Sequence, residues 1–191
     1  MNEYDALRNY LNKVTFFPKE DIDTFTDYFE KRIIKKKQFI IQPDFVAKYR
    51  IYVAAGAFRA YVIGEDGQEH TISLAIEDWW ISDPNSYYFQ TPATMFVQAL
   101  EDSIILQLDF ETEALLKEKF SKFEPFFRFT AERAFAFTQR RLIASLTLSA
   151  EDRYKEFIRT YPDIIQRVPQ YVVASYLGMT TEYLSRIRKK S

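Results

Sequence analysis

The spacing of apolar residues changes twice along this chain of 191 residues. Residues 3–12 have helical spacing, and Pro18 followed by Glu20 predicts the start of a second helix, because proline suits a first helical turn and acids suit its dipole. After Lys31 the chain has short runs rich in β-branched and aromatic residues, which predict strands. These runs are residues 39–41, 50–54, 57–63, 71–74, 95–100 and 103–108. From about Asp109 the helical period returns.

Short polar links separate the predicted strands. Asp66-Gly67 is a strong signal for a hairpin turn, and Glu101-Asp102 joins the last two runs, which we expect to pair with each other. Several short strands with regular turns predict a small barrel or sandwich. The predicted fold class is α+β, with an antiparallel β-barrel or jelly roll and its flanking helices in residues 1–123.

Residues 124–148 predict one long helix of about seven turns. Its apolar residues form two stripes on a helical wheel, whereas a helix lying on its own domain needs one. The helix is then either the central helix of a monomer or packs one stripe against a second copy of the chain, and we expect the dimer. One stripe holds Phe127, Ala131, Ala134, Phe135, Leu142 and Leu146, and the other holds Phe126, Phe129, Ala136, Phe137, Ile143 and Ala144.

The last part of the chain, residues 149–191, carries the clearest functional pattern. Pro169 opens a short helix, Gly178 lies just past its end, and Thr180 or Thr181 can cap the next helix. Two helices joined by a tight glycine turn, the second with a basic outer face, are typical of a helix-turn-helix DNA-binding motif, although an ordinary helical hairpin shares some of these features. The predicted apolar contacts between the two helices are Val173, Leu177, Met179, Leu184 and Ile187.

The net charge of −1 hides an asymmetry along the chain. Residues 1–123 contain 14 Lys and Arg against 20 Asp and Glu, whereas residues 124–191 contain 12 against 7. A basic C-terminal part favours an anionic partner, although basic residues are also common in a solvated last helical turn.

Composition excludes several kinds of chemistry. The chain has no cysteine and one histidine, His70, which excludes disulfides, thiolate or multi-histidine metal sites and cysteine nucleophiles. No phosphate-binding loop, dinucleotide fingerprint or nucleophile elbow occurs. We therefore expect no catalytic residue, no metal, no cofactor and no enzyme activity. No apolar run approaches the ~20 residues of a membrane span, and the start lacks a signal pattern, so a soluble cytoplasmic protein is expected.

An acidic barrel, a long helix and a C-terminal helix-turn-helix, in this order, resemble the CRP/FNR family of bacterial transcription regulators. The resemblance covers nearly the whole chain and is sharpest from Ser149 to Lys190, where Ala-Glu-Asp-Arg-Tyr, Arg-Val-Pro-Gln and Leu-Gly-Met-Thr look like the family's DNA-binding domain. It implies a cyclic-nucleotide-binding-like effector domain in residues 1–123, dimerisation through residues 124–148 and promoter binding by residues 149–191. Double-stranded DNA and a second copy are the implied partners, and RNA polymerase and a small-molecule effector are further candidates. The family usually continues into a β-hairpin wing, whereas this sequence ends at Ser191, so the resemblance is to a short form without a wing.

The resemblance also implies which residues contact DNA. In the family, base-reading positions lie at the start and middle of the second helix of the motif, and here these are Thr181, Glu182 and Arg186. Glu182 can accept from a cytosine amino group, and Arg186 can pair with guanine. Ser185, Arg188 and Lys189 are candidates for phosphate contacts. The complete expected set is Thr180, Thr181, Glu182, Ser185, Arg186, Arg188 and Lys189.

The effector site departs from the family pattern. Members that bind cyclic nucleotides have a Gly-Glu-Leu turn and then an Arg followed by Ser or Thr and Ala around the phosphate. Here residues 75–83 lack the glycine, residues 91–94 lack the arginine, and no arginine lies between Arg59 and Arg128. We therefore expect no useful affinity for cyclic AMP, although an arginine from another strand, Arg32, Arg50 or Arg59, could reach in.

The two adjacent tryptophans of this stretch could line a pocket for a partly aromatic effector, or could simply be packing residues. The candidate effector pocket consists of Glu77, Asp78, Trp79, Trp80, Thr91 and Thr94.

Two functions remain open. The first is a dimeric DNA-binding regulator that does not respond to cyclic AMP. The second is a small-ligand sensor or protein-interaction module with the same barrel and no specific DNA binding. The outer face of residues 180–190 discriminates between them, because a regulator needs Arg186, Arg188 and Lys189 exposed together, whereas a structural hairpin lets them pair with local acids.

Overall fold

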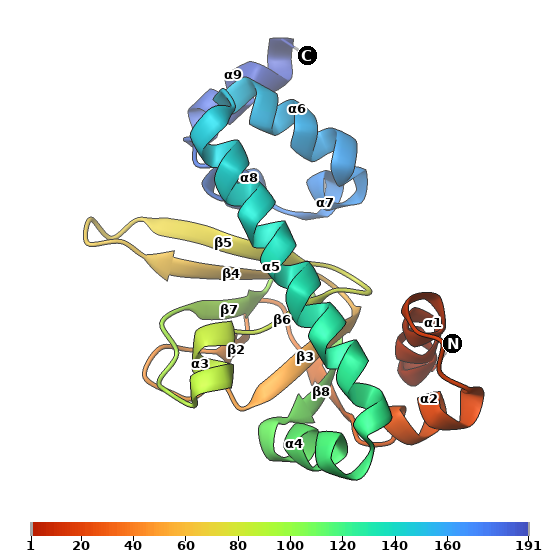
Figure 1. Cartoon of the computed structure of the whole chain (residues 1–191). Helices are drawn as coiled ribbons and strands as arrows, with labels where there is room; N and C mark the ends of the chain where they lie inside the picture. The colour runs from red at the N-terminus through yellow and green to blue at the C-terminus, as the bar shows by residue number, and fades with distance from the viewer. Residues whose placement is uncertain (1, 191) are drawn as a thin grey trace.

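A computed structural model describes residues 2–190 and places an N-terminal β-structure before a C-terminal group of helices (Figure 1). Helices α1 (Glu3–Val14) and α2 (Lys19–Thr26) come first, and α3 (Pro84–Phe89) lies between the sixth and seventh strands. The strands of the described chain are β1 (Glu30–Ile34), β2 (Phe39–Ile41), β3 (Tyr49–Ala55), β4 (Phe58–Ile63), β5 (Glu69–Ala75), β6 (Trp80–Ile81), β7 (Phe96–Ala99) and β8 (Ser103–Asp109).

These strands form two antiparallel four-stranded sheets, in the orders β1-β8-β3-β6 and β2-β7-β4-β5. Within the described residues neither sheet closes on itself, so the chain takes the jelly-roll form of the predicted α+β fold and not that of a closed barrel. β4 and β5 pair as a hairpin around Gly67, which has a φ of 79°, as the Asp66-Gly67 signal predicts.

The expected pairing of residues 95–100 with residues 103–108 is wrong. β7 pairs with β2 and β4, whereas β8 pairs with β1 and β3 in the other sheet. A short polar link such as Glu101-Asp102 can close a hairpin or cross between two facing sheets. The choice depends on which partner strands bury each face, and this information lies far away in the sequence.

Alternating residues of the strands build two separate cores. On β3, Ile51 and Val53 face the space between the sheets, whereas Tyr52 packs on the outer face under the N-terminal helices. On β8, Ile105 and Leu106 divide in the same way. The period of two therefore places the jelly-roll interior and a second aromatic core on opposite faces of one sheet.

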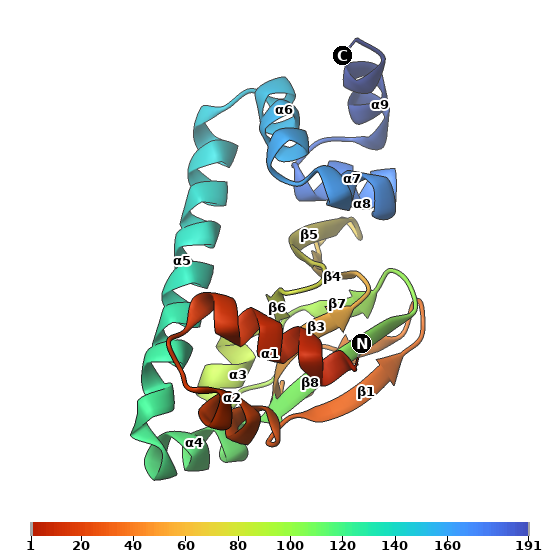
Figure 2. The ribbon, with the colours of Figure 1, turned by 90° about the vertical axis from the view of Figure 1, so that its right-hand side faces the viewer.

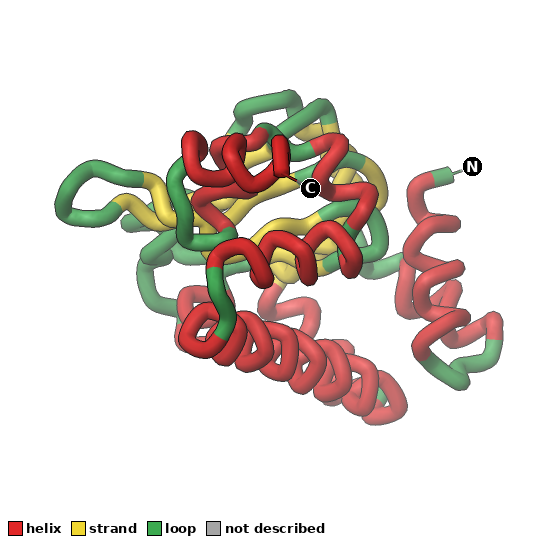
Figure 3. The backbone as a smooth tube through the Cα atoms, turned by 90° about the horizontal axis from the view of Figure 1, so that it is seen from above, coloured by secondary structure: helices red, strands yellow, loops and turns green. Residues whose placement is uncertain are grey.

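A continuous helical region follows the last strand. It comprises α4 (Phe110–Lys119), the 3-10 turn η1 (Ser121–Phe123), α5 (Glu124–Thr147), α6 (Ala150–Thr160), α7 (Pro162–Arg167), α8 (Gln170–Tyr176) and α9 (Thr181–Lys190). α5 confirms the predicted long helix and runs along one side of the molecule, from α4 at the base to α6 at the top (Figure 2). Seen from above, α6 to α9 cover one end of the jelly roll (Figure 3). None of the helices in residues 2–190 has the length and apolar content of a membrane span.

The two predicted stripes of α5 do not separate its buried side chains from its exposed ones. Buried side chains occur only near its start, where Phe126 and Phe127, taken from different predicted stripes, both pack against the N-terminal helices. Farther along, large apolar side chains of both stripes are exposed. The exposed fraction is 42% for Phe129, 69% for Phe135, 58% for Leu142, 54% for Ile143 and 77% for Leu146. A helical wheel assigns faces but cannot show where along its length a helix leaves its own domain.

Candidate nucleic-acid interface

A tight turn at Gly178 joins α8 to α9. Gly178 has a φ of 67°, and its N–H donates to the carbonyl of Ser175 at 3.1 Å. The N–H of Met179 donates to the carbonyl of Ala174 at 3.0 Å, so carbonyls left open at the end of α8 are satisfied. Across the turn Thr180 caps α9, because its Oγ1 accepts from the N–H of Tyr183 at 3.1 Å. The sequence left the cap open between Thr180 and Thr181, and the structure assigns it to Thr180.

The contacts between α8 and α9 are the apolar residues that the motif predicts. Val173, Leu177, Leu184 and Ile187 are buried, and Met179 is half-buried against the same cluster. Ala174 is 1% exposed at the middle of α8, in line with the small residue that a close helix crossing needs.

The outer face of α9 carries the expected DNA-contacting side chains. Glu182, Arg186, Arg188 and Lys189 are exposed, and Thr181 and Ser185 are half-buried beside them. Within residues 2–190 no ion pair joins these three basic residues to an acid. The Arg186 guanidinium lies 5.3 Å from the ring centroid of Tyr183, one turn earlier. The helix therefore presents a basic surface that local acids do not neutralise.

Hydrogen bonds fix α8 to the edge of the second sheet. The Ser175 hydroxyl accepts from the N–H of Thr71 at 2.8 Å and donates to the carbonyl of Glu69 at 2.7 Å. Both partners lie on β5, the edge strand of its sheet. Ser175 of α8 thereby uses backbone groups that an edge strand leaves without a partner strand.

Two arginines extend this connection. Arg141 of α5 donates to the carbonyls of Thr71, Ile72 and Tyr176 at 2.8 to 2.9 Å, and so joins the long helix, the sheet and α8. Arg167, the last residue of α7, forms two bonds to Glu77 at 2.6 and 2.9 Å and also pairs with Glu101. Sequence reasoning missed both arginines, because their partners are backbone carbonyls or acids at least 35 positions away.

The pairing with Arg167 changes the expected role of Glu77. Burial raises the pKa of this carboxyl, but the Arg167 guanidinium and the N–H of Gly56 outweigh burial and hold the pKa below its ordinary value. Glu77 therefore ties the jelly roll to α7 as a carboxylate and does not face a ligand.

The six residues of the predicted effector pocket do not come together. Trp79 lies edge-on to Phe137 of α5 and to Tyr161, whereas Trp80 packs against Tyr10 and other aromatic rings of the N-terminal core. Trp79 lies just before β6 and Trp80 is its first residue, and the two rings pack against different hydrophobic clusters, so they do not line one cavity. Of the two readings that the sequence left open for the tryptophans, packing is the one that the structure supports.

The remaining pocket candidates are also engaged elsewhere. Asp78 accepts from the Tyr52 hydroxyl at 2.6 Å. The N–H of Thr94 donates to buried Asp83 at 2.9 Å, and the carbonyl of Thr91 accepts from the Ser86 hydroxyl. The predicted effector pocket is therefore corrected to a set of packing and loop-closing contacts.

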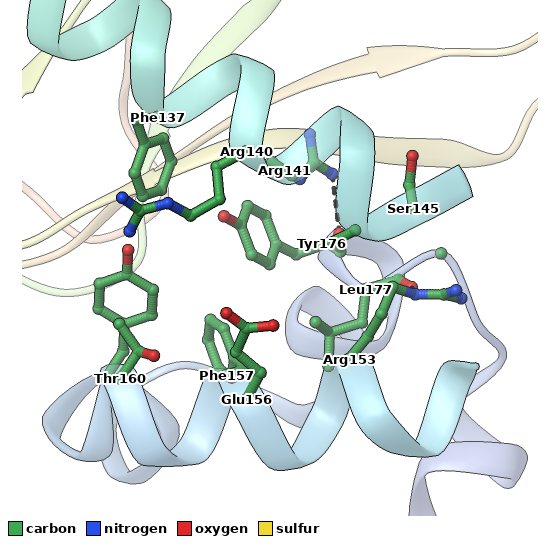
Figure 4. Close-up of a pocket in the computed structure, with 13 residues that line it drawn as sticks. Phe137, Arg140, Arg141, Ser145, Arg153, Glu156, Phe157, Thr160, Tyr176 and Leu177 are labelled. Atoms are coloured by element: carbon green, nitrogen blue, oxygen red, sulfur yellow. Dashed lines mark hydrogen bonds between the residues drawn. The ribbon is translucent and has the colours of Figure 1, made fainter. Parts of the chain in front are cut away.

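Two cavities stand out in the described chain, and neither contains those six residues. One, of about 220 Å³, lies at β2 and the loop before β3. The other, of about 260 Å³, lies between α5, α6 and the end of α8 (Figure 4). No group of three or more His, Asp or Glu side chains that could hold a metal ion occurs in the part of the chain that the structure describes.

Comparisons with known proteins give similarity in fold and none in sequence. No family model and no curated protein matches the chain. The solved structure of FixK2 from Bradyrhizobium japonicum matches with a TM-score of 0.74 and 14% identity over 85% of this chain and 83% of that one. CLP of Xanthomonas campestris, described as a c-di-GMP responsive global regulator, matches with a TM-score of 0.70 and 16% identity over 91% of both chains.

A third match carries the family name. A transcriptional regulator of the CRP/FNR family from Eubacterium rectale matches with a TM-score of 0.70 and 15% identity over 95% of this chain and 87% of that one. The chain therefore has the fold of the CRP/FNR regulators, as its order of elements predicts.

Proposed function

We propose that this chain, which has the fold of the CRP/FNR regulators, is a transcription regulator that binds promoter DNA as a dimer and is not an enzyme. The outer face of α9 carries the proposal, since Arg186, Arg188 and Lys189 are exposed together without an acid partner in the described residues. Basic residues are common in a last helical turn, but Arg186 lies near the middle of α9, where that reason does not apply. Glu182 and Arg186 are suited to base edges, and Ser185, Arg188 and Lys189 to phosphates.

The exposed part of α5 supports the dimer. Phe135 and Leu142 are seven residues apart, and Ala131 and Leu146 lie one turn before and one turn after them on the same face. An exposed apolar row of this kind can form the contact between two paired helices. Two copies paired along it would place two α9 helices on one side of the dimer, where they can read half-sites about one helical turn apart.

Selection of genomic DNA fragments tests the proposal directly. Purified protein is mixed with fragments of the source genome at low salt, and the bound fragments are sequenced. We expect enrichment of one two-fold symmetric or nearly symmetric sequence. The matched control is the double variant Arg186→Ala/Lys189→Ala, which should bind no fragment selectively. If the wild-type chain enriches nothing over random DNA, the proposed regulator is wrong and the sensor or interaction module is the better reading.

Independence from cyclic AMP is part of the proposal. Buried side chains such as Phe58 and Tyr87 pack in the space between the two sheets. Of the three arginines that could have reached in, Arg50 pairs with Glu113 and Arg59 pairs with Glu69. The third, Arg32, is exposed on β1. A phosphate placed between the sheets would lack a cationic partner.

A further inference from the structure

The cavity between α5, α6 and the end of α8 has aromatic walls from three helices. Phe137 comes from α5, Phe157 from α6, and Tyr176 from α8, and Tyr161 follows α6. Ring centroids of Phe157 lie 5.7 Å from Tyr161 and 5.5 Å from Tyr176, and those of Phe137 and Tyr161 are 6.2 Å apart. The four rings therefore contact one another and form a continuous aromatic wall, against which a flat apolar body can pack.

The polar side chains of the cavity carry an excess of positive charge. Arg140, Arg141 and Arg153 line it, against one acid, Glu156. Arg140 extends from α5 and Glu156 from α6 into the same space (Figure 4). Because these two side chains have no ion pair in the described residues, each is available to a ligand.

The other two guanidinium groups lack carboxylate partners as well. Arg141 donates to three backbone carbonyls, and Arg153 donates to the carbonyls of Leu148 and Leu177 at 2.8 and 3.0 Å. Carbonyl oxygens satisfy the N–H groups but leave the charge uncompensated. Burial accordingly lowers the pKa of Arg141. An anion in the cavity would supply the missing charge.

We propose that this cavity binds a small organic anion with a flat aromatic body, its rings among the four aromatic side chains and its anionic group at Arg140. The cavity volume of about 260 Å³ suits a small ligand. The Tyr176 hydroxyl, which donates to no acceptor in residues 2–190, offers a further hydrogen bond to the occupant.

The position of the cavity gives the occupant a consequence for DNA binding. A ligand there would contact α5, α6 and Gly178 at the turn before α9, so its presence should change the affinity for DNA. This consequence rests on the proposed function. The binding itself does not, because it is measured on the free protein.

Two dyes that share one aromatic body test the site. 1-Anilinonaphthalene-8-sulfonate carries an anionic group, and N-phenyl-1-naphthylamine has the same ring system without it. Fluorescence titration of the full chain should show saturable binding of one sulfonate dye per chain, at least about tenfold tighter than binding of the neutral dye, because a charge-assisted contact with Arg140 exists only for the former.

Three variants separate this site from other apolar surfaces. Arg140→Gln should weaken the sulfonate dye about tenfold and leave the neutral dye within about twofold. Arg128→Gln, which removes an exposed arginine of α5 outside the cavity and about three turns from Arg140, should change neither. Ala144→Phe should fill the cavity and abolish saturable binding of both dyes. The proposal is overturned if Ala144→Phe still binds the sulfonate dye normally, or if Arg140→Gln and Arg128→Gln behave alike.

Discussion

Two glycines with positive φ, Gly178 and Gly56, differ in the reason for which the fold needs a glycine there. Gly178 has a φ of 67° and open space around the position of a Cβ, so only its backbone conformation opposes a side chain. Gly56, between β3 and β4, has a φ of 106°, and a Cβ there would lie 2.0 Å from Ser103 Oγ and 2.8 Å from Ser103 Cα. At Gly56 both conformation and space require glycine.

We therefore predict unequal effects of alanine at the two positions. Gly178→Ala should lower the free energy of unfolding by about 1 kcal/mol, the cost of a left-handed conformation for a residue with a Cβ. Gly56→Ala should cost clearly more, because the approach to backbone forces the strands to move. Urea unfolding of the two variants and the wild type measures both, and equal losses would contradict the prediction.

A buried ion pair links β3 to α4. Arg50 Nε and Nη2 donate to Glu113 at 2.5 and 3.0 Å, and Tyr87 and Lys117 also bond to this carboxylate at 2.7 and 2.8 Å. Side chains of the pair are 11% and 4% exposed. Glu113→Gln should lower the free energy of unfolding by about 3–5 kcal/mol, because it leaves the Arg50 charge buried without its partner. The double variant Arg50→Met/Glu113→Met should recover most of this loss in the same urea unfolding measurement, and failure to do so would contradict the prediction.

The same carboxyl predicts a pH dependence. Burial raises the pKa of Glu113, but hydrogen bonds from Arg50, Lys117 and Tyr87 outweigh it and hold the pKa below its ordinary value of 4.5. Its stabilising contribution is thus present above pH 4.5 and is lost as the pH falls through the lower folded-state pKa. Urea midpoints should fall less steeply below pH 4.5 in Glu113→Gln than in the wild type. A steeper fall in the variant would show the opposite sign.

On α5, five large apolar side chains are exposed, namely those of Phe129, Phe135, Leu142, Ile143 and Leu146. Leu142→Glu should convert the proposed dimer of about twice 22.7 kDa into a monomer, because it places a charge in the contact between the paired helices. Arg133→Glu is the matched control. It lies nine positions earlier, two and a half turns at about 3.6 residues per turn, and so on the opposite side of the helix. Light scattering at micromolar concentration gives both masses, and a folded wild-type monomer would contradict the proposed contact.

On α9, two basic side chains are predicted to act differently. Arg186→Ala should cost about 1–3 kcal/mol of binding free energy and relax specificity at one base position. Lys189→Ala should weaken all sequences alike and reduce the slope of log affinity against log salt by about one. Fluorescence anisotropy over a salt series, on the selected site and on single-base variants, separates the two. If both variants change specificity in the same way, the assigned roles are wrong.

At the scale of the whole molecule, the C-terminal helices and the jelly roll share a hydrophobic cluster. Leu74 of β5, Ala57 and Leu100 pack with side chains of α6 to α9. Ion pairs of Arg167 and hydrogen bonds of Ser175 and Arg141 hold the same junction. The jelly roll and the C-terminal helices are therefore packed together in the described chain. The cavity of about 260 Å³ lies beside this junction.

The ion pairs of Arg50 and Arg59 in the jelly roll lead to the last prediction. Cyclic AMP and cyclic GMP should show no saturable binding tighter than about 10 μM in isothermal titration. A phosphate in the interior would have no cationic partner, and the missing contact would cost several kcal/mol of binding free energy. The control is the anionic dye, which should bind the same preparation at the helical cavity. Saturable competition between the two nucleotides would contradict the prediction.

The sequence by itself determined six of the eight strands in residues 2–190, the hairpin at Gly67, the long helix and the turn between α8 and α9, but it missed β1, β6 and α3. These features follow from local signals, because apolar period, a glycine with positive φ and a capping hydroxyl act over a few residues. The candidate DNA-contacting side chains came instead from the resemblance to the CRP/FNR family, and the spacing of the buried Leu184 and Ile187 agrees with an exposed outer face of α9.

Only the tertiary structure decided how distant parts meet. It assigned β7 and β8 to different sheets, directed Trp79 and Trp80 into different cores, and paired Glu77 with Arg167, 90 positions away. It also placed the basic, aromatic cavity at the junction of α5, α6 and α8. Each of these depends on which surfaces bury each other across the whole fold, and local spacing carries no information on that choice.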